Sequence, residues 1–213
     1  MDRISYGLRH NLFAIPRFTN INSQETDFLR GYGIWGGAHR EGINPDRIGI
    51  GADFKTSLST PGPWKAVLIA YGECLPYYDN KVELDHDHKD KWGLPLLKIS
   101  VEFKDNEMVM RRDMKAQVGE IFEAAGIKDI DVWVEEKPIP GDSVHDMGGV
   151  RMGRDPKTSV LNGHNQCHDV PNLFVTDGSC MTSCSNMAPS LTFMALTARA
   201  CDYAVKQMKK GEI

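Results

Sequence analysis

The 213 residues carry a formal net charge of -4, with 41% hydrophobic and 25% charged residues. These proportions are typical of a folded globular protein, and without a basic excess nucleic acid is not expected as a partner. No apolar run approaches the roughly 18 residues that cross a bilayer. Because residues 1–16 also lack a signal-peptide core, we expect a cytoplasmic chain with no membrane span.

The five cysteines are odd in number and lack paired spacing, which favours reduced thiols over disulfides or a zinc site. Cys180 and Cys184 are four residues apart, as are His164 and His168. The glycines and prolines around them argue against a shared helix face, so we expect no metal site.

The first half of the chain predicts mainly strands. Residues 1–64 carry turn signals such as "GYGIWGG" and predict irregular structure with short strands. Residues 66–73 form an apolar run of strand length, which Asp79-Asn80 would turn into a hairpin. Residues 94–103 alternate as a strand with one buried face, made of Leu97, Ile99, Val101 and Phe103.

Two helices are predicted further along. Residues 105–125 have apolar side chains at spacings of three and four, with Asp105 as the N-cap and Gly126 in the stop position. Residues 190–209 form a second helix after Pro189, since proline is favourable at the start of a helix.

Two short strands are expected between these helices, at residues 130–137 and 172–178. The second strand leads through "DGSCMTSCSNMAPSLT", residues 177–192, into the last helix. A strand that delivers a chain to a helix N-terminus directs free backbone N–H groups and the positive end of the helix dipole to one point. That point suits an anionic or electron-rich cofactor edge, unless the local Ser and Thr side chains only cap and turn the backbone: Ser179, Thr182, Ser183 and Ser190.

The other distinctive stretch is "HDMGGVRMGRDP", which begins at His145. Gly148 and Gly149 leave room for a bulky ligand to approach the backbone. A neutral imidazole at position 145 can accept a proton from an alcohol, although a lone histidine is also often a packed or surface residue.

Together, "HDMGGVRMGRDPKTSVLN", "HDVPNLFVTDGS" and "MAPSLTFMALTARACDYAV" resemble, in order and spacing, the C-terminal region of the glucose-methanol-choline (GMC) family of FAD-dependent oxidoreductases. The upstream "TDFLRGYGIWGGAHREG" and "PGPWKAVLIAYGECLPYYDNKVELD" resemble the substrate-binding region of bacterial members that act on sugars and polyols, the branch of gluconate dehydrogenase and pyranose oxidase. The similarity covers only about the second half of a typical member, and the family's GxGxxG fingerprint is absent. It therefore implies a fragment, a separate subunit or a truncated gene product.

The resemblance implies an α+β fold, an antiparallel sheet of about six strands with helices on one face. Residues 1–171 would form the substrate-binding domain, and residues 172–213 a strand-loop-helix unit that completes the FAD-binding domain. FAD would bind only together with the missing N-terminal half, from a complementary chain or domain. Apolar surface for that docking, and for self-association, is expected on the last helix at Leu191, Met194, Leu196 and Val205.

The resemblance also assigns roles. His145 would take the hydroxyl proton while a hydride leaves the same carbon, and Asp177 and Gly178 would approach the FAD pyrophosphate and ribityl chain. The other expected cofactor-binding residues are Met187, Ala188, Pro189 and Thr192.

The motif departs from the family at one position. Ala188 stands where members have a catalytic Asn or His, and a methyl group cannot orient or polarise an alcohol. Asn186, two residues upstream, is the candidate second catalytic residue if the loop is rearranged.

The expected function is therefore the substrate-binding half of an FAD-dependent oxidoreductase, which oxidises a CH–OH group of a sugar or polyol by hydride transfer to flavin. The alternative is a degenerate, non-catalytic sugar-binding subunit, which Ala188 favours. A hydrolase that uses one of the serines is a third possibility, but no GxSxG motif is present.

Overall fold

The structure is a computed structural model, and it describes residues 12–40, 49–59, 62–135, 138–141, 145–184 and 186–213. Parts of the predicted irregular region, and the last two residues of the expected strand at 130–137, lie outside this description. The elements, in chain order, are β1 (Leu12–Ile15), β2 (Tyr32–Arg40), α1 (Ala52–Ser59), β3 (Trp64–Gly72), β4 (Lys81–Lys89), β5 (Pro95–Ser100), α2 (Asp105–Ala124), a 3-10 turn (Gly178–Cys180) and α3 (Ser190–Lys210).

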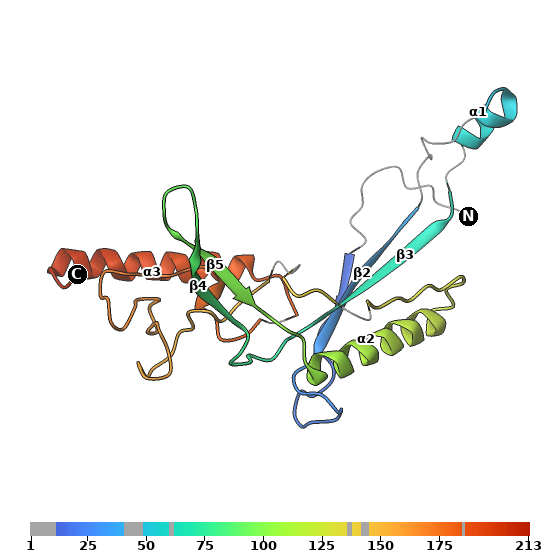
Figure 1. Ribbon diagram of the computed structural model, residues 1–213. Coiled ribbons are helices and arrows are strands. Elements are labelled where there is room, and N and C mark those ends of the chain that lie inside the picture. The colour runs from blue at the N-terminus through green and yellow to red at the C-terminus, as the bar shows by residue number, and fades with distance from the viewer. Residues whose placement is uncertain (1–11, 41–48, 60–61, 136–137, 142–144, 185) are drawn as a thin grey trace.

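A three-stranded antiparallel sheet, in the order β1-β2-β3, forms the first folding unit. Helix α2 runs along the sheet (Figure 1), and the buried side chains of Tyr32 and Ile34 in β2 pack against Met110 and Val118 of the helix. Because side chains alternate along a strand, the even-numbered residues of β2 face α2 and the odd-numbered residues face away from it. The sheet therefore has one face covered by α2.

The buried carboxylate of Glu107 fixes the start of α2. Its Oε1 accepts from the Leu75 backbone N–H at 3.0 Å, and its Oε2 accepts from the Tyr77 hydroxyl at 2.9 Å and the Lys104 backbone N–H at 3.0 Å. Burial of Tyr77 and its bond to Glu107 raise the tyrosine pKa to about 12. These bonds tie the segment after β3 to the helix. Lys104 rather than Asp105 is the N-cap.

A second, smaller unit lies along α3, at the other end of the structure (Figure 1). Its core consists of Leu161, Cys167 and Cys180, against which Leu196 of α3 packs. Asn165, in the left-handed region with φ of 64°, exchanges hydrogen bonds with Val175: its Nδ2 donates to the Val175 carbonyl, and its own carbonyl accepts from the Val175 N–H. This unit is mostly loop, so such bonds hold it together.

Strands β4 and β5 form a separate two-stranded hairpin with one apolar face. Val82 lies opposite Ile99, and Leu84 lies opposite Leu97. All four are between 54% and 67% exposed. The face that the sequence predicts to be buried is therefore uncovered in this structure.

The chain exposes far more surface than a closed domain of its size. Its accessible area is 16081 Å², whereas a folded monomer of this mass exposes about 9,900 Å². Among the described residues, thirty large hydrophobic side chains are exposed and nine hydrophobic residues are buried. On α3, Leu191, Met194 and Val205 are exposed as predicted, but Leu196 is not, because it packs on the second core.

The α+β class and both long helices are confirmed, including Gly126 after α2 with a left-handed φ of 71°. A single sheet of six strands is not confirmed, because the described residues form five strands in two sheets. The predicted hairpin between residues 66–73 and the strand after Asn80 is wrong, since β3 pairs with β2 and β4 with β5.

Two predicted strands do not form among the described residues. Residues 130–135 are extended without strand pairing, and residues 172–178 contain only an isolated bridge between Gln166 and Phe174. A strand needs a neighbour to receive its backbone hydrogen bonds, and residues 172–178 have one only over Leu173–Val175, which bond with residues 165–167. In the described part of the chain, no helix has both the length and the apolar character to cross a membrane.

The fold predicts a large effect at Tyr32, whose fully buried hydroxyl donates to Asp113 Oδ2 at 2.5 Å. Tyr32→Phe leaves that carboxylate without its partner and should lower the free energy of unfolding by about 1–3 kcal/mol. Tyr78→Phe, at a side chain that is 98% exposed, is the control and should change it little. Equal denaturation midpoints for the two variants would contradict the role of this bond.

The same pair predicts a pH dependence. Burial and the bond to Asp113 raise the pKa of Tyr32 well above its ordinary value of 10.0. A raised folded-state pKa contributes stability below the unfolded-state pKa, and this stability is lost as the pH rises above about 10. Urea unfolding between pH 8 and about 11 should show this alkaline loss in the parent chain and less of it in Tyr32→Phe.

Candidate functional site

Backbone hydrogen bonds join the two distinctive stretches of the sequence. The Val150 N–H donates to the Ser179 carbonyl at 2.9 Å, and the Met152 N–H donates to the Cys180 carbonyl at 2.8 Å. The segment after His145 therefore runs beside the turn that precedes α3. The structure brings together two motifs that are thirty residues apart in sequence.

Gly178 is the point of closest approach between these segments. A Cβ at this position would lie 2.8 Å from the carbonyl oxygen of Asp146 and 3.2 Å from Cζ of Phe193. Only a glycine allows this contact without a shift of the backbone. Half-buried His145 is thus next to a residue that touches the turn at Asp177-Gly178.

Asp177 shapes the turn itself. Its Oδ1 accepts from the Ser179 backbone N–H at 2.9 Å and from the Ser179 hydroxyl. Asp177 is therefore the N-cap of the 3-10 turn, and the Ser179 hydroxyl holds the capping carboxylate in place. The Asp177 side chain is used for the turn, and its residue remains exposed beside Gly178.

The N-terminus of α3 has no side-chain cap. Pro189 precedes the helix and is buried, whereas Met187, Ala188 and Thr192 are exposed around it. The first N–H groups of an α-helix have no acceptor within the helix, and the helix dipole makes this end electropositive. The start of α3 thus suits an anionic or electron-rich group.

Asn186 lies against the sheet. A Cβ on Gly33 of β2 would be 1.8 Å from the Asn186 Nδ2 atom, so the amide packs directly on the glycine. This nitrogen is buried and has no hydrogen-bond partner among the described residues. The loop before α3 thereby connects the sheet to the two motif segments.

The thiol of Cys184 is in the same loop. Burial, with smaller contributions from the carboxylates of Glu73 and Asp146, raises its pKa.

The histidines four residues apart have other contacts. The His164 ring stacks on Tyr203 of α3 with centroids 4.1 Å apart, and His168 Nε2 is 3.2 Å from the Ser159 hydroxyl. Within the described ranges, no group of three or more His, Cys, Asp or Glu residues is placed to bind a metal.

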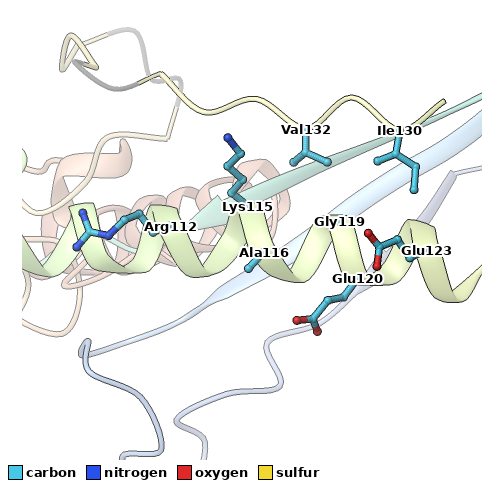
Figure 2. A pocket seen from close by; sticks show the side chains of 8 residues that line it. All are labelled: Arg112, Lys115, Ala116, Gly119, Glu120, Glu123, Ile130 and Val132. Atoms are coloured by element: carbon cyan, nitrogen blue, oxygen red, sulfur yellow. The ribbon is translucent and has the colours of Figure 1, made fainter.

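An open depression of about 620 Å³ lies elsewhere, between α2 and the extended segment that follows it. Figure 2 shows Ile130 and Val132 on that segment pointing toward the helix. The helix side carries both signs of charge, from Arg112, Lys115, Glu120 and Glu123. None of the predicted site residues lines it, so this depression is not the candidate active site.

A family model described as GMC oxidoreductase matches residues 76–197, which is more than half of the chain. The chain belongs to the GMC oxidoreductase family. The matched region includes both motif segments, with the 3-10 turn in the second of them, and the first residues of α3.

Several characterised GMC proteins are similar to this chain. A 2-methyl-1,2-propanediol dehydrogenase of Mycolicibacterium austroafricanum is 38% identical over 137 residues, which cover 64% of this chain and 24% of that protein. A gluconate 2-dehydrogenase flavoprotein of Pantoea cypripedii is 30% identical over 155 residues, covering 69% and 25%, respectively. A fructose dehydrogenase large subunit of Gluconobacter japonicus is 29% identical over 144 residues, covering 68% and 26%.

The chain thus spans about a quarter of the length of the relatives that it matches. GMC oxidoreductases are FAD-dependent, and the residues present fit one edge of that cofactor. The uncapped start of α3 and the exposed residues around Pro189 leave an electropositive surface open.

Sequence reasoning missed the contribution of β2. The "GYGIWGG" segment was interpreted as a turn signal within irregular structure and short strands, but residues 32–40 form a nine-residue strand. Glycines inside a strand can instead mark a close approach by another backbone or side chain. Here Gly33 receives Asn186, and the glycines of this segment were the only sequence signal of such a contact.

The close approach at Gly178 predicts a steric effect. Gly178→Ala would force apart the Asp146 carbonyl and Phe193, and should lower the free energy of unfolding by about 1–3 kcal/mol. Gly163→Ala is the matched control, since a Cβ there meets nothing within 4 Å. If thermal melts show equal stability for the two variants, the segments do not meet as described.

Proposed function

We propose that this chain is the substrate-binding part of an FAD-dependent oxidoreductase that oxidises a CH–OH group of a sugar or polyol. The observation that carries the proposal is the pairing of the segment after His145 with the turn that leads into the uncapped N-terminus of α3. This arrangement supports the proposal, because it brings the segment that begins at His145, the proposed proton acceptor, beside the turn that leads to the electropositive end of α3.

The proposed reaction removes a proton and a hydride from the alcohol, and each goes to a different acceptor. The alcohol O–H proton moves to an imidazole nitrogen of His145 while the C–H bond breaks, and the carbon and oxygen become a carbonyl. FAD, when bound, supplies the acceptor for the hydride. The unpaired N–H groups in the first turn of α3 would stabilise negative charge that lies at this end of the helix.

The FAD-binding portion must come from outside these 213 residues, either from the same polypeptide or from another. The surface supports this part of the proposal, because the excess of about 6,000 Å² over a closed monomer is larger than one side of an ordinary protein interface. The division into a substrate-binding domain over residues 1–171 and an FAD-completing unit over residues 172–213 is proposed on the same basis. A complementary FAD-binding portion is favoured over self-association, since a second copy would bring the same excess.

The second catalytic group is proposed to be Asn186. Ala188 is exposed near the start of α3 and has no polar atom to offer an alcohol. Asn186 lies two residues away, and its amide nitrogen has no partner in the described structure. A non-catalytic sugar-binding subunit is the second candidate function, and the specific observation that favours it is the alanine at position 188.

The first test is flavin retention. The isolated chain should be colourless, because it supplies few of the contacts to FAD. A chimera in which this chain replaces the matching quarter of the 2-methyl-1,2-propanediol dehydrogenase should hold about one flavin per chain, measured by visible absorbance. Anaerobic addition of a sugar or polyol should then bleach the flavin. A yellow isolated chain, or a flavin-loaded chimera that no alcohol bleaches, would contradict the proposal.

The second test uses variants of the chimera. His145→Ala should slow flavin reduction by about 10²- to 10⁴-fold, the usual contribution of a general base. Asn186→Ala should slow it by about 10²-fold or more if its amide polarises the alcohol, and Ala188→Asn should raise the rate. Stopped-flow bleaching measures all three, with Gly163→Ala as the control. Unchanged reduction in His145→Ala would remove this residue from the mechanism.

A further inference from the structure

The face of the sheet that points away from α2 carries an aromatic pair. Trp35 of β2 and Tyr71 of β3 have ring centroids 5.5 Å apart and planes inclined at 54°. Tyr71 lies directly opposite Gly33, and Trp35 lies opposite Ile69. Since residues 33 and 35 are odd-numbered, all of these side chains are on the face opposite α2.

Two nitrogen donors on this face have no acceptor among the described residues. The indole Nε1 of Trp35 and the amide Nδ2 of Asn186 are both buried and have no hydrogen-bond partner among the described residues. Asn186 Nδ2 rests on Gly33, two residues along the same strand from Trp35. Folded proteins pair nearly all buried donors, because an unpaired one keeps the cost of its lost hydration. The pair therefore indicates a place where a ligand supplies oxygen acceptors.

The rest of the face is apolar and open. Val67, Ile69 and Tyr71 are 47%, 50% and 39% exposed, respectively. Aromatic and aliphatic side chains with a few directed donors form the usual lining of a site for a small organic ligand. The apolar C–H face of a ring sugar packs on aromatic rings, while its neighbouring hydroxyls accept hydrogen bonds.

The face is also continuous with the proposed catalytic residues. Asn186 is on the loop that follows the turn at Gly178, and a Cβ at Gly178 would lie 2.8 Å from the carbonyl oxygen of Asp146, the neighbour of His145. A ligand held over Gly33 and Trp35 would thus lie beside the segment that carries the proton acceptor.

We propose that the Gly33, Trp35, Tyr71 and Asn186 face is the wall of the alcohol-binding site, and that it selects a cyclic, polyhydroxylated sugar over an open-chain alcohol. Trp35 and Tyr71 contact the C–H face of the ring. Trp35 Nε1 and Asn186 Nδ2 donate to two of its oxygens, once the atoms that bury these two nitrogens move aside. Gly33 is a positioning residue, since any side chain there would displace Asn186. This inference rests on the proposed function, and it adds the class of substrate.

A binding experiment tests the face without requiring catalysis. In the flavin-loaded chimera, with tryptophan side chains labelled with ¹⁵N, the indole N–H signal of Trp35 is identified by its loss in Trp35→Phe. Titration with D-glucose, D-galactose, D-fructose and myo-inositol should shift this signal with at least one of them. The signal of Trp92, which is 74% exposed on the β4–β5 turn, should stay unchanged. D-gluconate and 1,2-propanediol at equal concentration should leave both signals in place.

Kinetics provides the second readout. Trp35→Phe keeps a ring but removes the N–H group, and should raise KM for the bound cyclic sugar by about tenfold with kcat within about twofold, as expected for one lost hydrogen bond. Gly33→Ala should weaken binding as Asn186→Ala does, and the double variant should be no worse than either single variant. Trp92→Phe is the matched control and should not change KM.

The outcomes separate the two proposals. If sugars bleach the flavin but Trp35→Phe and Trp92→Phe have equal KM values, the aromatic face is not the subsite, and the proposed function stands. If no alcohol bleaches the flavin but cyclic sugars shift the Trp35 signal, the oxidoreductase proposal fails and the face is a sugar-binding site. If the Trp35 signal never shifts, or shifts equally with open-chain alcohols, the inference of a cyclic sugar is overturned.

Discussion

The two hydrophobic cores of this chain are small, and the surfaces around them are open, so uncovered apolar area is the constraint that shapes the whole structure. One core lies between the three-stranded sheet and α2, and the other lies along α3. The hairpin of β4 and β5 belongs to neither and leaves Val82, Leu84, Leu97 and Ile99 exposed on one face. Burial of such side chains is the main favourable term in folding. The alternating pattern therefore predicts the strands correctly, but the layer that would bury their apolar face is absent from the described structure.

Several contacts between these parts lie at the candidate site. Backbone bonds at Val150 and Met152 join the segment after His145 to the turn before α3, and Asn186 joins the same loop to β2. Two glycines make the approach possible, Gly33 on the sheet and Gly178 in the turn, because each occupies a place where a Cβ would collide with a neighbour. The site is thus built where elements from distant parts of the sequence come into backbone contact.

The alanine at position 188 decides how this site is interpreted. Its methyl group cannot replace a hydrogen-bonding side chain, yet the nearby Asn186 has an amide nitrogen without a partner. An unpaired buried donor and a missing polar side chain two residues apart are consistent with a loop in which the polar role has moved. The contact with Gly33 gives that displaced amide a fixed position on the sheet rather than a free one.

The sequence by itself determined the features that depend on local patterns: the α2 and α3 helices from their apolar spacing, Gly126 as the stop, and the family from motifs near His145 and Asp177. Tertiary structure alone decided which strands pair, because alternation in residues 66–73 and 94–103 does not name a partner. It also turned the glycine-rich residues 32–40 into a strand, since their glycines are needed for packing rather than for turns. The approach of Asn186 to Gly33, on which the proposed site wall depends, could not be predicted from the sequence for the same physical reason. A close contact between residues 33 and 186 depends on how the chain folds back on itself, which local spacing does not record.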